Sequence, residues 1–278
     1  IEGIRCFSLF DDAMISMRYA KNLAEGFGPV WNPASQPVEG YTNPLWMLYM
    51  TIPHLLGISA FKTSLFIQVS SALFFILHLF FLKRITDLLS GGSNAVMIFA
   101  VLLNILYQPL LTWTLLGMET ALLLPLISAA LWLSIKNYIS GKFSYFQIIL
   151  PAIAILVRLD SALLFASFAV FAVIINKNKS KIIFLSLLVL FFAVAPLTLF
   201  RFFFYGDLLP NTYYLKMTGF PPILRITRGA FSALKFIVYM NPGVFLLPFL
   251  YVFYKKEKLL IFISILFFLQ IAYSIYSG

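Results

Sequence analysis

Two consecutive aspartates near the amino end, Asp11 and Asp12, are the residues best placed to do chemistry. They open a segment with apolar residues at helical spacing that stops at Gly26, which predicts a short helix with both carboxylates in its first turn. A carboxylate there can accept a proton from an incoming hydroxyl, or it can cap the helix. Consecutive helical positions point about 100° apart, so the two side chains can hardly share one role. We favour Asp11 as the base, because it shares a helix face with Arg18 and Asn22, and Asp12 as the cap.

Membrane helices must position these carboxylates. Of the 278 residues, 62% are hydrophobic and 11% are charged, which excludes a water-exposed globular surface. Apolar runs that approach the roughly 20 residues of a membrane span occur at residues 64–82, 121–135, 161–175, 182–205 and 259–276. We therefore expect an all-α polytopic membrane protein, with the short first helix lying in the membrane interface.

Two regions are expected along the chain. Residues 1–45 form a long first extracytoplasmic loop that carries the Asp-Asp pair, and residues 46–278 form the transmembrane helical bundle. The chain begins without an initiator Met and ends directly after a span, so we expect a fragment that is truncated at both ends.

The net charge of +10 does not indicate a nucleic-acid partner, because the bases lie at the ends of apolar runs. Loops at residues 83–84, 136–142, 176–181 and 255–258 are strongly basic, and the positive-inside rule places them in the cytoplasm. The segments that alternate with them then face outward and hold most of the acids. We interpret this mixed charge as a site assembled on the outer side; the alternative is that it only solvates the loops.

Six stretches on this outer side resemble the motifs of one family. They are residues 11–26, 30–33, 39–46, 116–120, 158–160 and 205–216. Together they are similar to the terminal arabinofuranosyltransferases of mycobacterial cell walls and their bacterial relatives. The Asp-Asp pair near Arg18-Tyr19-Ala20 also resembles a motif of the lipid A aminoarabinose transferases.

Both groups are glycosyltransferases of the GT-C fold. The resemblance implies a GT-C-like transmembrane bundle in a bacterial cytoplasmic membrane, with its active site facing the periplasm or exterior. It also implies inverting transfer of a sugar from a polyprenyl-phosphate donor to a glycan, lipid or protein acceptor of the cell envelope. Membrane lipids are the surrounding partners.

The implied chemistry assigns roles to particular residues. An acid of the first loop, Asp11 or Asp12, would be catalytic. Arg158, Lys216 and Arg201 would bind the donor phosphate and stabilise the charge that develops as it leaves. Sugar or acceptor binding would fall to Arg18, Glu39, Tyr41, Asn43, Glu119, Asp160, Asn211 and Tyr213.

Each role has a structural alternative. Arg158 would form an ion pair with Asp160 at a helix break, Glu119 would be an acid at a helix start, Tyr41 would join an interfacial aromatic belt, and Lys216 would anchor a loop to headgroups. No His or Cys pattern indicates zinc, and adjacent aspartates are a weak signal for a divalent cation, so cofactor and metal dependence stay open.

Two other functions account for part of this pattern. A transporter or flippase for a lipid-linked sugar would line its pathway with the same charges, but it predicts polar residues near the midplane and an inverted repeat. A structural membrane scaffold does not account for the long polar first loop.

Overall fold

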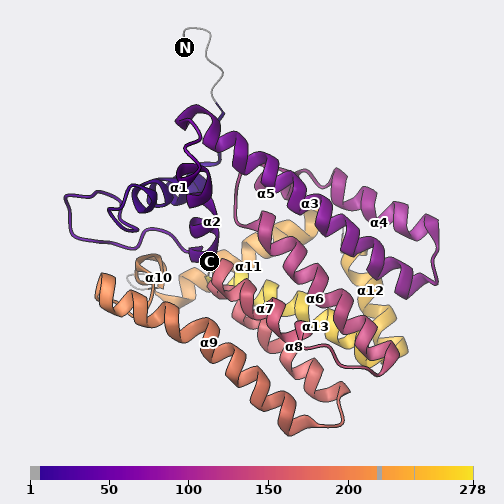
Figure 1. The fold of residues 1–278 in the computed structure, drawn as a ribbon. Helices are drawn as coiled ribbons and strands as arrows, with labels where there is room; N and C mark the ends of the chain where they lie inside the picture. The colour runs from indigo at the N-terminus through magenta and orange to yellow at the C-terminus, as the bar shows by residue number, and fades with distance from the viewer. Residues whose placement is uncertain (1–6, 218–220, 241, 278) are drawn as a thin grey trace.

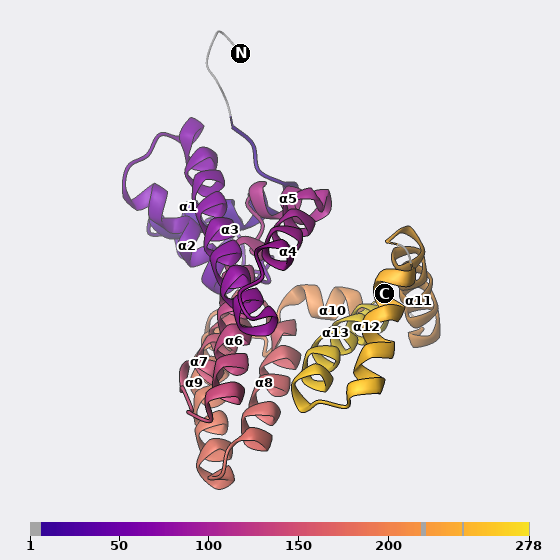
Figure 2. The ribbon, with the colours of Figure 1, turned by 90° about the vertical axis from the view of Figure 1, so that its right-hand side faces the viewer.

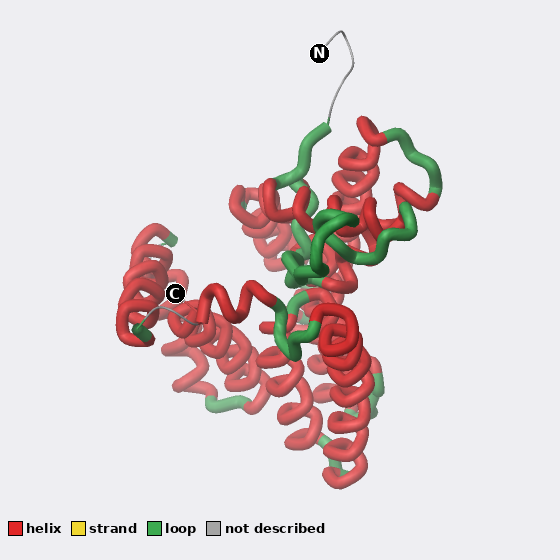
Figure 3. The backbone as a smooth tube through the Cα atoms, turned by 90° about the vertical axis from the view of Figure 1, so that its left-hand side faces the viewer, coloured by secondary structure: helices red, strands yellow, loops and turns green. Residues whose placement is uncertain are grey.

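The computed structural model describes residues 7–217, 221–240 and 242–277, apart from the side chains of residues 216–217 and 244–247. The described chain is built of helices and loops, with no strand (Figure 3). The helices are α1 (Asp11–Ala24), α2 (Pro44–Leu55), α3 (Ala60–Ser90), α4 (Asn94–Leu106), α5 (Gln108–Leu115), α6 (Thr120–Ser140), α7 (Phe146–Val157), the 3-10 turn η1 (Leu159–Ser161), α8 (Ala162–Ile175), α9 (Lys179–Tyr205), α10 (Asn211–Met217), α11 (Pro222–Tyr239), α12 (Pro242–Lys255) and α13 (Lys258–Ser277).

Four of these helices, α3, α6, α9 and α13, are long and apolar enough to cross a membrane. A fifth crossing results if α4 and α5, which are bent by 64° at their junction, form one broken span. Large apolar side chains project outward from these helices, such as Leu73 of α3 and Phe184 and Phe191 of α9. Such apolar faces suit contact with lipid. The backbone of these helices is compatible with lipid too, because a helix satisfies its own backbone hydrogen bonds. The all-α, multi-pass expectation is confirmed at this level.

The prediction of a complete span at residues 161–175 is wrong. Helix α8 has 14 residues, and α7 before it has 12, so each is shorter than a full crossing. The chain breaks between them at Arg158, whose backbone is extended. The sequence does not predict α7 as a separate helix, because this segment is continuously apolar and contains Pro151.

The bundle has two chemically different ends. Ile85 of α3, Ile135 of α6, Phe171 of α8 and Leu259 of α13 share one buried cluster. Lys83 and Arg84 lie inside α3, beside Ile85, so the prediction of a loop there is wrong. The other three basic loops adjoin the ends of the remaining helices, so all four groups of bases lie at one end, here called the basic end. At the other end, here called the site end, Ile67 of α3 and the first turn of α6 pack in a separate cluster with residues of α1 and α2.

Helices α1 and α2 and the loop between them, residues 25–43, form a cap layer over the site end (Figures 1 and 2). Ala13, Met17 and Ala20 of α1 are buried, as the helical spacing predicted. Gly26 follows the helix at φ +86° and ends it, also as predicted. Asn22 differs from the prediction of an exposed polar face, because it is buried and donates to the Val30 carbonyl at 2.7 Å.

Candidate functional site

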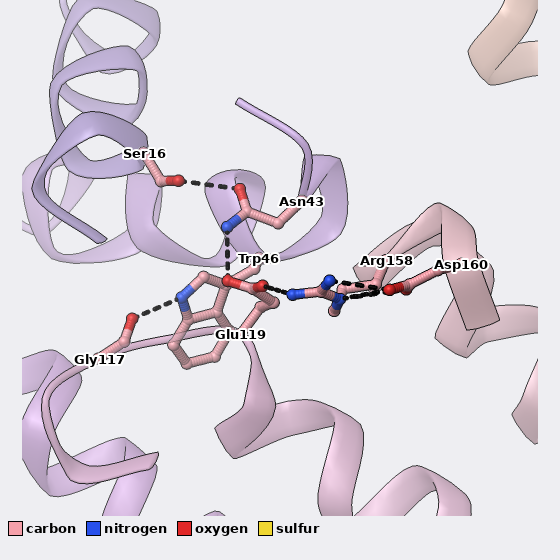
Figure 4. A network of polar contacts seen from close by, with 7 residues as sticks. All are labelled: Ser16, Asn43, Trp46, Gly117, Glu119, Arg158 and Asp160. Carbon is pink, nitrogen blue, oxygen red and sulfur yellow. Dashed lines mark hydrogen bonds and ion pairs between the residues drawn. The ribbon is translucent and has the colours of Figure 1, made fainter. Parts of the chain in front are cut away.

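A chain of polar contacts joins the cap layer to the bundle (Figure 4). The Ser16 hydroxyl of α1 donates to Asn43 Oδ1 at 2.9 Å, and Asn43 Nδ2 donates to Glu119 Oε2 at 2.9 Å. Arg158 Nη1 then donates to Glu119 Oε1 at 2.7 Å, and Arg158 Nη2 donates to Asp160 Oδ2 at 2.8 Å. We call these five residues the Arg158 network.

Helix ends place the charges of this network. Glu119 immediately precedes α6, Arg158 lies in the break after α7, and Asp160 lies in η1. The Glu119 side chain is 3% exposed, whereas that of Arg158 is 37% exposed. Burial alone would lower the pKa of Arg158, but its ion pairs with Asp160 and Glu119 outweigh burial and raise that pKa. The network therefore holds one firmly charged guanidinium between two carboxylates.

Arg158 has N–H donors that its two ion pairs do not use. A guanidinium has five N–H groups, and the contacts to Asp160 and Glu119 engage Nε and one N–H on each terminal nitrogen. The predicted ion pair with Asp160 is confirmed, but it uses only part of this capacity. The partly exposed guanidinium can still donate toward the adjoining cavity.

The backbone at Gly117 contacts the cap layer beside this network. The Trp46 indole donates to the Gly117 carbonyl at 2.9 Å, and the Phe10 amide donates to the Leu116 carbonyl at 2.9 Å. Gly117 has φ +84°, and a Cβ atom there would lie 2.8 Å from Leu9 Cδ2. The backbone conformation therefore favours glycine, and any larger residue would also push the Leu9 side chain aside.

A second contact set, the Arg201 cluster of Glu39, Tyr41, Arg201 and Tyr205, ties the α1–α2 loop to α9. Arg201 Nε donates to Glu39 Oε2 at 2.8 Å, and the two side chains are 2% and 3% exposed. Burial raises the pKa of Glu39 against the opposing effect of Arg201. Arg201 Nη2 is buried without a hydrogen-bond partner in the described structure.

Tyrosines complete this attachment. Tyr205 donates to the Pro29 carbonyl at 2.6 Å, so its oxygen accepts from the Tyr41 hydroxyl at 3.2 Å. Tyr19 of α1 donates to the Val38 carbonyl at 2.7 Å and accepts from the Gly40 amide at 2.9 Å. The backbone on both sides of Glu39 is therefore held by the Tyr19 hydroxyl.

A cavity of about 720 Å³, here called the site cavity, opens beside the Arg158 network. It lies between α8 and α13 and is lined by residues of three motif stretches: Thr42, Arg158, Asp160, Pro210, Thr212 and Tyr213. Three segments that are distant in the sequence therefore meet at one concave surface. Such a surface, with a few charged groups on an apolar wall, is typical of a ligand site.

The two aspartates lie outside this lining. Both are exposed at the start of α1, and Asp11 Oδ1 accepts the Asp12 amide at 3.0 Å. This contact joins neighbouring residues, and no side chain caps α1, so the prediction that Asp12 is the cap is wrong. Asp12 lies four positions before Ser16, on the same helix face and about one turn (~5.4 Å) away.

The other predicted residues divide between the cavity and the interior. Asp160 and Tyr213 line the site cavity, and Asn211 begins α10 beside it. Glu39, Tyr41, Asn43, Glu119 and Arg201 are buried, so their side chains hold the loop and the network. Tyr41 is 3% exposed, which contradicts a place in an interfacial aromatic belt.

Arg18 and Lys216 are separate cases. Arg18 donates to the Trp31 carbonyl at 2.8 Å and stacks over the Trp31 ring, so it fixes the α1–α2 loop. The side chain of Lys216 lies outside the described part of the structure.

Sequence reasoning missed Ser16, Thr42 and Tyr205. Ser16 occupies a helix face that the apolar pattern left undecided, and Tyr205 ends a span where an aromatic residue is common. Thr42 lies in the motif stretch at residues 39–46, and its position between Tyr41 and Asn43 could have indicated a site residue. Within the described residues, no three His, Cys, Asp or Glu side chains gather as metal ligands would.

Comparisons of the chain with protein-family models, with curated proteins and with solved structures find no match.

Proposed function

We propose that this chain is a membrane glycosyltransferase of GT-C type, which moves a sugar from a polyprenyl-phosphate donor to a hydroxyl of a cell-envelope glycan, lipid or protein. The observation that carries the proposal is the site cavity, where Thr42, the Arg158–Asp160 pair and Thr212–Tyr213 meet between apolar helices. A lipid-linked sugar needs this combination, since its lipid stays in the membrane while its sugar phosphate needs polar contacts.

The reaction requires a base and a stabiliser of the leaving group. A carboxylate accepts the proton of the acceptor hydroxyl, whose oxygen bonds to the anomeric carbon as the bond from that carbon to the phosphate oxygen breaks. Polyprenyl phosphate leaves with the bonding electrons. The remaining N–H donors of Arg158 can stabilise its charge, and Lys216 is a second cation for this role.

Asp11 and Asp12 remain the candidate bases, and the structure favours Asp12. Asp11 is engaged with the start of α1, whereas Asp12 shares a helix face with Ser16 of the Arg158 network. In this proposal Glu39, Tyr41, Asn43, Glu119 and Arg201 are positioning residues. They hold the cap layer on α6, the α7–α8 break and α9.

A transporter or flippase for a lipid-linked sugar is the second candidate. The broken α4–α5 pair favours it, because discontinuous helices often form the binding sites of transporters. The ion pairs seen in the described residues, however, all lie in or beside the cap layer or at the site end. This one-sided arrangement suits surface chemistry better than passage through the bilayer.

A donor screen separates the two candidates. The purified protein in lipid nanodiscs is incubated with polyprenyl-phosphate sugars and candidate acceptors, and mass spectrometry measures released polyprenyl phosphate. We expect release with at least one donor and a strong loss in the Asp11→Asn/Asp12→Asn double variant. Movement of intact lipid-linked sugar across proteoliposomes, without release, would instead establish the transporter.

A further inference from the structure

A second cavity continues the site cavity along the bundle. It has a volume of about 400 Å³ and is lined by Ala166, Val170 and Ile174 of α8 and by Ile261, Ile265 and Leu269 of α13. Leu269 also lines the site cavity, so the two hollows adjoin along the same pair of helices. We call the continuous depression the α8–α13 groove.

The groove runs almost the whole length of α13. Tyr276 and Ser277 border it at the site end, and Lys258 borders it at the basic end. A helix of 20 residues rises roughly 30 Å, which is about the thickness of a bilayer's hydrocarbon core. A ligand in this groove would therefore extend through most of the membrane.

The lining changes character along that length. Polar and charged side chains, among them Arg158, Asp160 and Thr212, lie at the site end. Apart from Ser167, aliphatic and aromatic side chains line the remainder down to Lys258. Val170 and Ile265 are 59% and 44% exposed, so the walls of the lower part face outward from the protein. A chain-like lipid could enter sideways from the membrane.

Arg225 of α11 adds a cation near the same end. Its Nε donates to the Tyr276 carbonyl at 2.9 Å, and its guanidinium lies 4.8 Å from the centre of the Tyr276 ring. Gly229, one turn further along α11, packs so tightly on Ile275 that a Cβ atom would lie 2.3 Å from its carbonyl oxygen. This close packing fixes Arg225 next to the wall of the site cavity.

We infer that the α8–α13 groove holds the polyprenyl chain of the donor, with the sugar phosphate in the site cavity and the chain descending toward Lys258. This inference rests on the proposed function and deepens it. A bilayer phospholipid fits less well, because it has two chains and a compact headgroup, whereas the structure offers one long apolar track that ends in a larger cavity with charged groups on one wall.

Chain length is the property that tests this assignment. A long polyprenyl phosphate would reach Val170 and Ile265, but farnesyl phosphate would stop in the upper part of the groove. Val170→Trp should fill the lower groove and weaken long-chain binding by about tenfold, a loss that is readily measured. The same variant should leave farnesyl phosphate binding unchanged. Val96→Trp is the matched control, because Val96 is 45% exposed on α4, away from the groove.

The experiment uses the whole chain in nanodiscs and a long polyprenyl phosphate with a photoreactive group at its far end. Mass spectrometry should locate crosslinks on α8 and α13 between the levels of Leu269 and Lys258, and Val170→Trp should remove them. Crosslinks spread over all lipid-facing helices, or lost equally in Val96→Trp, would overturn the inference. Equal competition by ordinary phospholipid would also overturn it, since the groove would then be a general lipid contact.

The crosslinking result does not depend on whether the protein transfers a sugar. Specific crosslinks in the groove without sugar transfer to any acceptor would support the lipid site and contradict the proposed glycosyltransferase. Transfer that persists with the full chain-length dependence in Val170→Trp would support the enzyme and contradict the groove.

Discussion

Arg158 donates to Glu119 at 2.7 Å, and this contact joins the break between α7 and α8 to the first residues of α6. The other oxygen of the same carboxylate accepts from Asn43, which starts α2. Glu119 is therefore the point at which the cap layer and two parts of the bundle meet. Since it is almost fully buried, changing any of its partners leaves a polar group without water or protein to bind.

Replacement of Asn43 by Ala should loosen the cap layer. It removes the donor to Glu119 and the acceptor of Ser16, and a hydrogen bond to a charged group typically contributes about 1.5–3 kcal/mol. Thermal unfolding in detergent should show a loss of this order. Gln36→Ala in the exposed part of the same loop is the control and should change the melting temperature little. Equal melting temperatures for the two variants would contradict the role of Asn43.

The Glu39–Arg201 pair should show strong non-additivity. Glu39→Gln leaves the buried Arg201 without a counter-charge, and breaking a buried pair costs about 3–5 kcal/mol. Glu39→Gln/Arg201→Met should be more stable than Glu39→Gln alone, because it removes the uncompensated charge. Chemical unfolding of four proteins measures this double-mutant cycle: the parent chain, Glu39→Gln, Arg201→Met and the double variant. Simple addition of the two single effects would show that the side chains act independently.

The two aspartates should separate into a catalytic and a structural residue. Asp12→Asn is expected to reduce turnover by orders of magnitude with donor affinity nearly unchanged, since a general base contributes about 10²–10⁴-fold. Asp11→Asn should leave turnover nearly unchanged and lower stability only slightly, by about 0.3–1 kcal/mol, because it removes a negative charge from the start of α1 but keeps an oxygen that can accept the Asp12 amide. Steady-state rates and melting temperatures of both variants decide between them. Full turnover in both single variants and in the double variant would remove this loop from the chemistry.

We expect the basic end of the bundle in the cytoplasm and the cap layer on the outer side of the membrane. A single cysteine at Ser35, in the cap layer, should react with an impermeant maleimide in intact cells, while one at Asn178 in a basic loop should not. Both positions are exposed, so accessibility within the protein does not limit either reaction. Cys6, the native cysteine, is replaced by Ser in both proteins. Labelling at Asn178 alone would reverse the orientation and contradict an outward-facing site.

The helices were predictable where a single local signal decides them. Long apolar runs identified α3, α6, α9 and α13, and Gly26 marked the end of α1. The bond between Arg158 and Asp160 was also predictable, because the residues are two positions apart. The α7–α8 hairpin was partly missed, since continuous apolar sequence does not reveal where a short helix stops.

The long-range polar contacts were not predictable. Asn43 and Glu119 are 76 positions apart, and Glu39 and Arg201 are 162 apart. Each of these residues carries a plausible local role, such as helix capping or interfacial anchoring, and no local rule selects its distant partner. The sequence therefore grouped the motif stretches correctly at one end of the bundle, but it assigned to ligand contact several side chains that the fold buries.

The attachment of the cap layer to α9 has a mechanical consequence. A helix of 27 residues is roughly 40 Å long, which exceeds a hydrocarbon core of about 30 Å, and such a helix adjusts to the bilayer by tilting. Arg201 and Tyr205, near the end of α9, carry Glu39 and Tyr41 with them whenever the tilt changes. A change in the tilt of α9 would therefore also move the loop that bears Thr42, and a bilayer of different thickness would alter the wall of the site cavity.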